Sequence, residues 1–198
     1  HAPANIVRPL HVRTVYWGEA FSDNAVMEAV QEQLEPDKGQ FLVHWPDDIL
    51  EATARKLAEG QIVARFDGQA EFGARALGAR SILAHPSRFD QIRRLNAAIK
   101  NRDFWMPFAA TILAERADDY LVNPRGLESP CMMMTFDTRA ERRAEIQAAI
   151  HPWDYTIRPQ ILGPDDNPEY RALIQIFESL TGVGAVLNTS LNLHGMPM

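Results

Sequence analysis

The 198 residues, 46% of them hydrophobic, are enough to bury the core of one domain of ordinary size. The net charge of −6 argues against a general nucleic-acid or acidic-membrane surface, because clustered positive charge drives binding to such polyanions. Cys131 is the single cysteine, which excludes a disulfide framework within the chain and favours a reducing compartment. No apolar run is long enough to span a bilayer and no signal-peptide pattern opens the sequence, so we expect a cytoplasmic protein.

The first predicted elements are two helices and a strand. Ser22 or Asp23 is expected to cap a helix that has an apolar face of Val26, Met27 and Val30. A second helix is expected between Asp47 and the stop at Gly60, because apolar residues recur there at helical spacing: Ile49, Leu50, Ala54 and Leu57. The sequence QIVARF, residues 61–66, then has the composition of a strand, which completes one helix-to-strand unit.

The later elements also interleave. The glycine-containing block 67–86 is expected to be a loop system that leads into a short strand at 81–84. An amphipathic helix is expected over 89–101 and another over 169–182, with strands at 108–113, 131–136 and 183–188. This alternation indicates a mixed α/β (α+β) sheet in a single domain, rather than a helical bundle or a β-sandwich.

The stretch EFGARALGARS, residues 71–81, is the densest candidate for binding chemistry. Its glycines allow a tight turn, across which Arg75 and Arg80 could converge on one anion. Guanidinium groups suit phosphate and carboxylate because their forked donors match two oxygens at once. The structural alternative is that both arginines are solvated or pair with Glu71.

Two further basic stretches and one histidine are weaker candidates. Lys100 and Arg102 end a predicted helix, where cations also complement the helix dipole. Arg158 precedes a proline among apolar neighbours and could bind an anion or only pair with Asp154. His151 could be an acid, a base or a structural histidine. The sequence has no cluster of Cys and His residues that predicts a zinc site.

The final stretch, VLNTSLNLHGMPM, places three polar residues at alternate positions. Side chains two residues apart share one side of an extended strand, so Asn188, Ser190 and Asn192 are expected to face one common point. That point is either solvent or a ligand.

Several of these segments together resemble a known family. EFGARALGARSILAHP, LNAAIKNRDFWMPFAATIL, SPCMMMTF, HPWDYTIRPQ and VLNTSLNLHGMP, in this order, are similar to the C-terminal domain of the O-carbamoyltransferases. That family includes enzymes of nodulation-factor, cephamycin and tobramycin carbamoylation. The resemblance covers residues 15–198, after an irregular segment 1–14, and the motif at the end of the chain suggests a truncated C-terminus.

The resemblance implies a YrdC/Sua5-like fold, which is a twisted open sheet with flanking helices. It also implies a nucleotide site built from a Lys-x-Arg pair, here Lys100 and Arg102, and a Ser-x-Asn pair, here Ser190 and Asn192. Arg75, Arg80 and Asn188 are expected to bind the nucleotide or phosphate, and Arg158 to lie near the carbamoyl or phosphate end.

The implied reaction forms carbamoyl-adenylate from carbamoyl phosphate and ATP, with Mg²⁺ accompanying the ATP. The expected partner is a Kae1-like transferase domain of the same polypeptide, which lies outside this chain and would pass the carbamoyl group to a hydroxyl. Two alternatives remain: a non-catalytic nucleotide-binding or scaffolding module, and an RNA-binding YrdC-like domain, which the charge of −6 disfavours.

Overall fold

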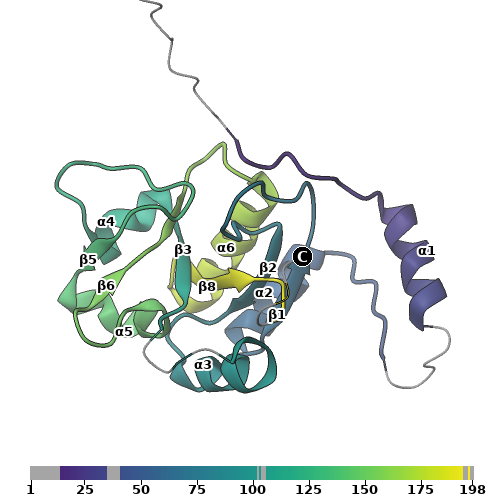
Figure 1. Cartoon of the computed structure of the whole chain (residues 1–198), viewed down its shortest axis with the longest axis horizontal. Coiled ribbons are helices and arrows are strands. Elements are labelled where there is room, and N and C mark those ends of the chain that lie inside the picture. The colour runs from purple at the N-terminus through teal and green to yellow at the C-terminus, as the bar shows by residue number, and fades with distance from the viewer. Residues whose placement is uncertain (1–13, 35–40, 102, 104–105, 194–195, 197–198) are drawn as a thin grey trace, which may run out of the picture.

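The computed structural model describes residues 14–34, 41–101, 103, 106–193 and 196. Its centre is a five-stranded sheet with the order β1-β2-β8-β3-β7 (Figure 1). Strands β3 and β7 are parallel, and the other neighbouring strands are antiparallel. The strands are β1 (Val63–Phe66), β2 (Arg80–Ala84), β3 (Ala109–Leu113), β7 (Gln160–Leu162) and β8 (Ala185–Ser190). All but β7 were expected from the sequence.

One face of this sheet is covered by two helices that pack on each other, α2 (Ile49–Ala58) and α6 (Pro168–Thr181). The Asp48 carboxylate caps α2 by accepting the Glu51 N–H at 2.9 Å, and the Asn167 amide oxygen caps α6. The buried side chains of α6 lie at helical spacing: Tyr170, Leu173, Ile174 and Phe177. Both helices follow the sequence prediction, although Leu180 at the end of α6 is exposed.

The opposite face packs against α3 (Phe89–Leu95) and the π-helical turn η1 (Asn96–Lys100). Leu95 and Phe108 belong to a buried cluster with three strand side chains: Ile82, Ala84 and Leu187. The turn ends at Asn101, which has a left-handed backbone with φ of 42°. The predicted single helix over 89–101 is therefore a short α-helix followed by a wider turn.

A smaller sheet joins three antiparallel strands, β4 (Leu121–Val122), β5 (Phe136–Thr138) and β6 (Thr156–Ile157). Around it lie α4 (Ala117–Tyr120), α5 (Arg143–Ile146) and three 3₁₀ turns, at Ala114–Arg116, Ala140–Arg142 and Gln147–Ala149. The predicted strand over 131–136 is wrong for most of its length. Met132 has a φ of 56°, which is incompatible with an extended strand, and β5 begins only at Phe136.

Residues 14–34 and 41–48, here called the arm, precede the compact part of the chain. The arm contains α1 (Asp23–Leu34), which stands apart from the rest of the molecule (Figure 1). The Ser22 hydroxyl accepts the Ala25 N–H at 3.3 Å, as the predicted cap requires. None of the described helices combines the length and the apolar character that crossing a membrane requires. Apart from the arm, the described residues form one compact domain with the mixed α/β fold expected from the sequence.

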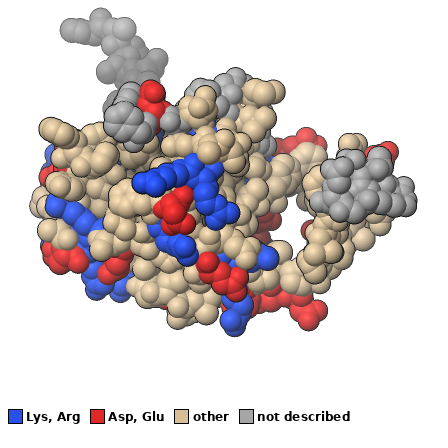
Figure 2. All heavy atoms as spheres, turned by 90° about the horizontal axis from the view of Figure 1, so that it is seen from below, with Lys and Arg blue, Asp and Glu red and all other residues tan. Residues whose placement is uncertain are grey.

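Charged side chains are mixed on the face of the molecule seen from below in Figure 1. There Lys and Arg lie among Asp and Glu over the compact part, without a continuous basic stripe (Figure 2). This face therefore lacks the charge pattern typical of a surface that follows a nucleic-acid backbone.

Candidate active site

The sheet topology brings the predicted site residues to one end of the larger sheet. Because neighbouring strands alternate in direction except for β3 and β7, this end holds the starts of β2, β3 and β7 and the ends of β1 and β8. Ser190 ends β8, Arg80 begins β2, and Arg158 lies just before β7. Segments far apart in the sequence therefore share one edge.

Lys100 and the Ser-x-Asn pair form the tightest cluster at this edge. The Lys100 ammonium donates to the Ser190 carbonyl at 2.5 Å and the Asn192 carbonyl at 2.8 Å. Its nitrogen also lies 3.1 Å from Ser190 Oγ and 2.9 Å from Asn192 Oδ1. The Ser190 hydroxyl donates to Asn192 Oδ1, and Lys100 is only 2% exposed. Lys100 is thus held in place by both residues of the pair and is not a solvated helix terminus.

The local backbone explains how residues ninety positions apart meet. The π-helical turn carries Lys100 at its last position and then stops at the left-handed Asn101. On the other side β8 ends at Ser190, and Asn192 lies in the bend that follows. The predicted extended alternation therefore does not reach Asn192, which meets Lys100 through the bend.

Asn188 lies two residues before Ser190 on β8, as the predicted alternation requires, but its side chain belongs to a separate buried hydrogen-bond network. Its Nδ2 group donates to the Ala76 carbonyl at 3.1 Å and to Thr111 Oγ1 at 3.1 Å. Thr111 Oγ1 also donates to Gln160 and accepts from the Tyr170 hydroxyl. The Asn188 Oδ1 atom is buried without a hydrogen-bond partner among the described residues. Asn188 therefore fixes the glycine loop to the sheet.

Arg75 and Arg158 form a pair of like charges beside this network. Both are exposed, and within the described part of the chain neither makes a hydrogen bond or an ion pair. Partial burial, and second the like charge of Arg75, lower the pKa of the Arg158 guanidinium. Asp154, the alternative partner of Arg158, instead lies 3.1 Å from His151 Nδ1 and accepts from Thr156. An anion between Arg75 and Arg158 would relieve their repulsion.

Arg80 differs from Arg75, although both were expected to bind an anion. Its Nη1 and Nη2 groups donate to four main-chain carbonyls, those of Glu19, Asp67, Gly68 and Ala79, at 2.8 to 3.2 Å. Its guanidinium carbon also lies 3.7 Å from the centre of the Phe66 ring. These contacts leave Arg80 few donors for a ligand, and its role in this structure is to hold the loop that carries Arg75.

Glu71 acts on the same loop, but through the main chain. Its Oε1 atom accepts from the N–H groups of Leu77, Ala79 and Arg80 at 2.7 to 3.2 Å. The Glu71 carboxylate is therefore held by main-chain N–H groups and not, as in the structural alternative, by an arginine side chain.

The remaining predicted groups have simpler surroundings. Arg102 lies outside the described residues, so its contribution stays a prediction. Cys131 is half-buried, and burial raises the pKa of its thiol. Among the residues described, no group of three or more His, Cys, Asp and Glu side chains could hold a metal ion.

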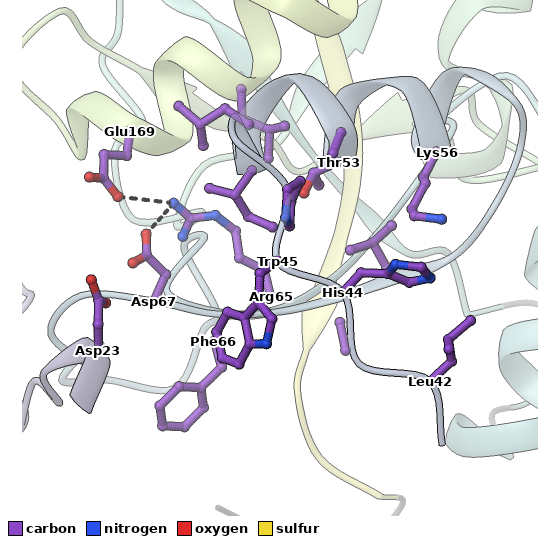
Figure 3. A pocket seen from close by; sticks show the side chains of 17 residues that line it. Asp23, Leu42, His44, Trp45, Thr53, Lys56, Arg65, Phe66, Asp67 and Glu169 are labelled. Carbon is purple, nitrogen blue, oxygen red and sulfur yellow. Dashed lines mark hydrogen bonds and ion pairs between the residues drawn. The ribbon is translucent and has the colours of Figure 1, made fainter. Parts of the chain in front are cut away.

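A cavity of about 1050 Å³, which no sequence pattern predicted, lies between the arm and the compact part (Figure 3). Arg65 in this cavity lies 2.5 Å from the Asp67 carboxylate and 4.0 Å from Glu169. The pKa of Glu169 is raised, first by a hydrogen bond with Asp67 and then by the charge of that carboxylate. No local pattern signals this cavity, because its walls come from the arm, α2, β1 and α6.

The comparisons with known proteins agree on one family. The family model described as the carbamoyltransferase C-terminus matches residues 54–198. An uncharacterized protein of Methanocaldococcus jannaschii is 35% identical over 191 residues, covering 96% of this chain and 36% of that protein. Nodulation protein NolO of Bradyrhizobium diazoefficiens is 34% identical over 185 residues, covering 93% of this chain and 33% of NolO.

A shorter match links the chain to nodulation protein U of Bradyrhizobium diazoefficiens, which is 37% identical over 139 residues, 70% of this chain and 24% of that protein. The chain spans about a third of the length of the curated relatives it matches over most of its own length. On these grounds the chain belongs to the carbamoyltransferase family and corresponds to its C-terminal domain.

Proposed function

We propose that this domain forms carbamoyl-adenylate from carbamoyl phosphate and ATP, as part of an O-carbamoyltransferase that carbamoylates a hydroxyl group. The observation that carries the proposal is the buried Lys100 ammonium, held by Ser190 and Asn192 at the sheet end where Arg75 and Arg158 also lie. Two polyanionic reactants repel each other, and fixed cations at one edge lower that repulsion.

The proposed chemistry joins a carbamoyl oxygen to the α-phosphorus of ATP while the bond from that phosphorus to pyrophosphate breaks. For the atoms to balance, the phosphate of carbamoyl phosphate leaves as inorganic phosphate and one water is consumed. Arg102 would donate to the transferring phosphoryl group, and Lys100, whose ammonium already donates to Ser190 and Asn192, would stabilise the developing charge through its own positive charge. Ser190 and Asn192 would hold the Lys100 ammonium in this position. Arg75 and Arg158 would bind the phosphate of one reactant through paired N–H donors.

Mg²⁺ enters this proposal as part of the ATP substrate. Three or more acidic, His or Cys ligands do not come together in the part of the chain that the structure describes. A Mg²⁺ ion commonly keeps several waters and binds chiefly through nucleotide phosphates, which suits a site lined by cations and amides. When bound, the ion would neutralise part of the phosphate charge.

Transfer to the hydroxyl acceptor is assigned to the part of the polypeptide that this chain does not include, which is expected to be a Kae1-like domain. The support is length, because the chain matches about a third of its relatives. The two halves of the reaction would then be divided between two domains of one polypeptide.

The test is release of pyrophosphate by the 198-residue chain with MgATP and carbamoyl phosphate. We expect release that depends on both substrates, and a loss of at least tenfold in Ser190→Ala and in Asn192→Ala. These two changes are chosen because Lys100→Met would leave buried oxygens without a donor and destabilise the fold by about 1 to 3 kcal/mol. Arg55→Lys on α2, far from the sheet end, serves as the control.

Calorimetry with ATP separates the alternatives. ATP binding without any pyrophosphate release would support the non-catalytic nucleotide-binding module and overturn the enzymatic proposal. Retention of RNA in place of ATP, weakening steeply with salt, would favour the RNA-binding reading.

A further inference from the structure

The arm has apolar side chains that stay partly or largely exposed in the described structure, although Trp17 contacts Phe72 and Phe21 contacts Phe66. Six of them are between 39% and 81% exposed: Trp17, Phe21, Val26, Met27, Leu42 and Trp45. Val26 and Met27 belong to one stripe of α1, and Glu28 and Glu32 lie on its opposite side. An amphipathic helix with an uncovered apolar stripe is typical of a surface that packs against another structure.

The arm also concentrates the negative charge of the chain. Residues 14–34 and 41–48 contain six Asp and Glu, out of 26 in the chain, but none of the 20 Lys and Arg of the chain. The other residues of the chain carry 20 Asp and Glu and 20 Lys and Arg, so the arm combines its exposed apolar side chains with the whole net charge of −6. A complementary surface would be apolar and bordered by Lys and Arg.

A recess accompanies these exposed side chains. The lining of the 1050 Å³ cavity includes Leu42 and Trp45 of the arm and Leu50 and Phe66 of the compact part, together with charged side chains such as Lys56, Arg65 and Glu169 (Figure 3). It is large enough to admit several apolar side chains from a partner.

The comparisons indicate where the arm belongs in the longer relatives. The family model begins at residue 54, after the arm. The match to the Methanocaldococcus protein covers 96% of this chain, which leaves out too few residues to exclude the arm. The arm is therefore shared with a protein of almost three times this length, although it precedes the C-terminal family domain.

We propose that the arm, with the adjoining cavity, is the surface on which the remaining two-thirds of the carbamoyltransferase polypeptide packs. The occupant is an apolar patch of that polypeptide bordered by basic residues. This proposal extends the proposed function by naming the contact surface between its two parts, and it rests on the expectation that the chain is one part of such an enzyme.

The arm is also connected to the candidate active site. The Phe72 N–H donates to the Val15 carbonyl at 2.7 Å, and the Tyr16 hydroxyl donates to the Leu77 carbonyl at 2.8 Å. Arg80 donates to the Glu19 carbonyl at 3.2 Å. The start of the arm is thus fixed to the loop that carries Arg75, so a partner packed on the arm would lie beside the cationic edge.

Hydrogen exchange measured by mass spectrometry tests the proposal, comparing the 198-residue chain with the full polypeptide that contains it. We expect amides of residues 23–34 and 41–45 to exchange at least tenfold more slowly in the full polypeptide. Residues 152–155, around the exposed Trp153, serve as the reference segment that keeps its rate. Equal exchange of the arm in both proteins would overturn the proposal.

Matched variants of the full polypeptide sharpen the test. Met27→Asp and Leu42→Asp should abolish most of the protection, because each places a charge in an apolar contact. Leu180→Asp is the control, since Leu180 is 41% exposed on α6, comparable to Met27 at 39% on α1. Protection unaffected by both arm variants would contradict the proposal. If the 198-residue chain forms a dimer and Met27→Asp abolishes that dimer, the surface binds a second copy of the chain, which would also overturn the proposal.

Pyrophosphate release by the same proteins separates this inference from the proposed function. If the arm is unprotected but pyrophosphate is released, the proposed contact surface is contradicted and the proposed reaction is not. If the arm is protected but no pyrophosphate is released, the proposed reaction is contradicted and the contact surface is not.

Discussion

Three arginines illustrate how much a residue's surroundings decide its use. Arg80 is buried and donates to four carbonyls, whereas Arg75 and Arg158 are exposed and share no hydrogen bond or ion pair with the described residues. A guanidinium with satisfied donors stabilises its own loop, and two that repel each other are available to an anion.

Replacing Arg75 or Arg158 with Lys should weaken binding of carbamoyl phosphate or ATP by about tenfold, because an ammonium cannot form two parallel N–H bonds to a phosphate. The melting temperature should not change, since both side chains are exposed. Isothermal titration with each substrate measures the effect. Arg55→Lys is the matched control, and equal affinity in all three variants would mean that charge alone, or neither arginine, matters.

His85 provides a pH-dependent test at the same scale. Its ring lies 5.1 Å from Phe177, edge to face, and its Nδ1 atom accepts from the Ser87 hydroxyl at 3.0 Å. Burial, and second the charge of Arg88, lower the pKa of the folded His85 below its usual 6.5. The unfolded chain therefore takes up this proton first as the pH falls below about 6.5, and the free energy of unfolding decreases through that window.

Urea unfolding between pH 5 and pH 8 measures this contribution. The slope of stability against pH below 6.5 should be smaller in His85→Gln, which can still accept the Ser87 hydrogen bond but does not titrate. An unchanged slope in this variant would show that other groups cause the acid sensitivity.

At the scale of elements, the glycine loop before β2 depends on close packing at one glycine and not at another. An added Cβ at Gly78 would lie 2.2 Å from the Tyr170 ring, and Gly78 has a φ of 113°. At Gly73, with a φ of 146°, the same atom would meet nothing within 4 Å. Gly78 therefore allows the loop to contact α6, and Gly73 has only a backbone requirement.

Gly78→Ala should destabilise the protein by about 2 to 4 kcal/mol, since it combines backbone strain with overpacking. Gly73→Ala should cost about 1 to 2 kcal/mol from strain alone. Denaturant unfolding measures both free energies. Similar losses in the two variants would show that the contact with Tyr170 relaxes without cost.

The elements that the sequence predicted are those with a long local signal. Helices α2 and α6 have capping residues and apolar spacing, and β1, β2, β3 and β8 are apolar runs between turn residues. Strands β4, β6 and β7 have two or three residues each, too few for a period to be recognised. The run CMMMTF has strand composition, but the left-handed Met132 interrupts it.

The candidate site was predictable only in part, for the same reason. Lys100, Ser190 and Asn192 were expected together because of a family resemblance, since periodicity cannot relate residues ninety positions apart. The engagement of Arg80 by four carbonyls and the separate network of Asn188 depend on tertiary contacts between distant segments. Local sequence patterns predict helices, strands and candidate residues. Contacts between distant segments decide which of those side chains remain available to a ligand.

For the whole molecule, the proposed division of the reaction between two parts of one polypeptide leads to a direct prediction. In the proposed function the sheet end supplies the positive charges of Lys100, Arg75 and Arg158, and the arm leaves apolar side chains exposed. A reactive acyl-adenylate must be kept from water until the acceptor arrives, which a second domain over this edge would provide.

The isolated chain should therefore make carbamoyl-adenylate but transfer no carbamoyl group to a hydroxyl acceptor. Incubation with MgATP, carbamoyl phosphate and a panel of sugars should give pyrophosphate, AMP and inorganic phosphate, without the mass increment of a carbamoylated sugar. Hydroxylamine, a stronger nucleophile than a sugar hydroxyl, should trap the intermediate as hydroxyurea with release of AMP. Hydroxyurea formed with ATP, in excess of the amount that carbamoyl phosphate gives without ATP, shows that the intermediate formed. The full polypeptide, under the same conditions, is the positive control for transfer. A carbamoylated sugar from the 198-residue chain alone would place the transfer site within these residues and contradict the assignment of transfer to the rest of the polypeptide.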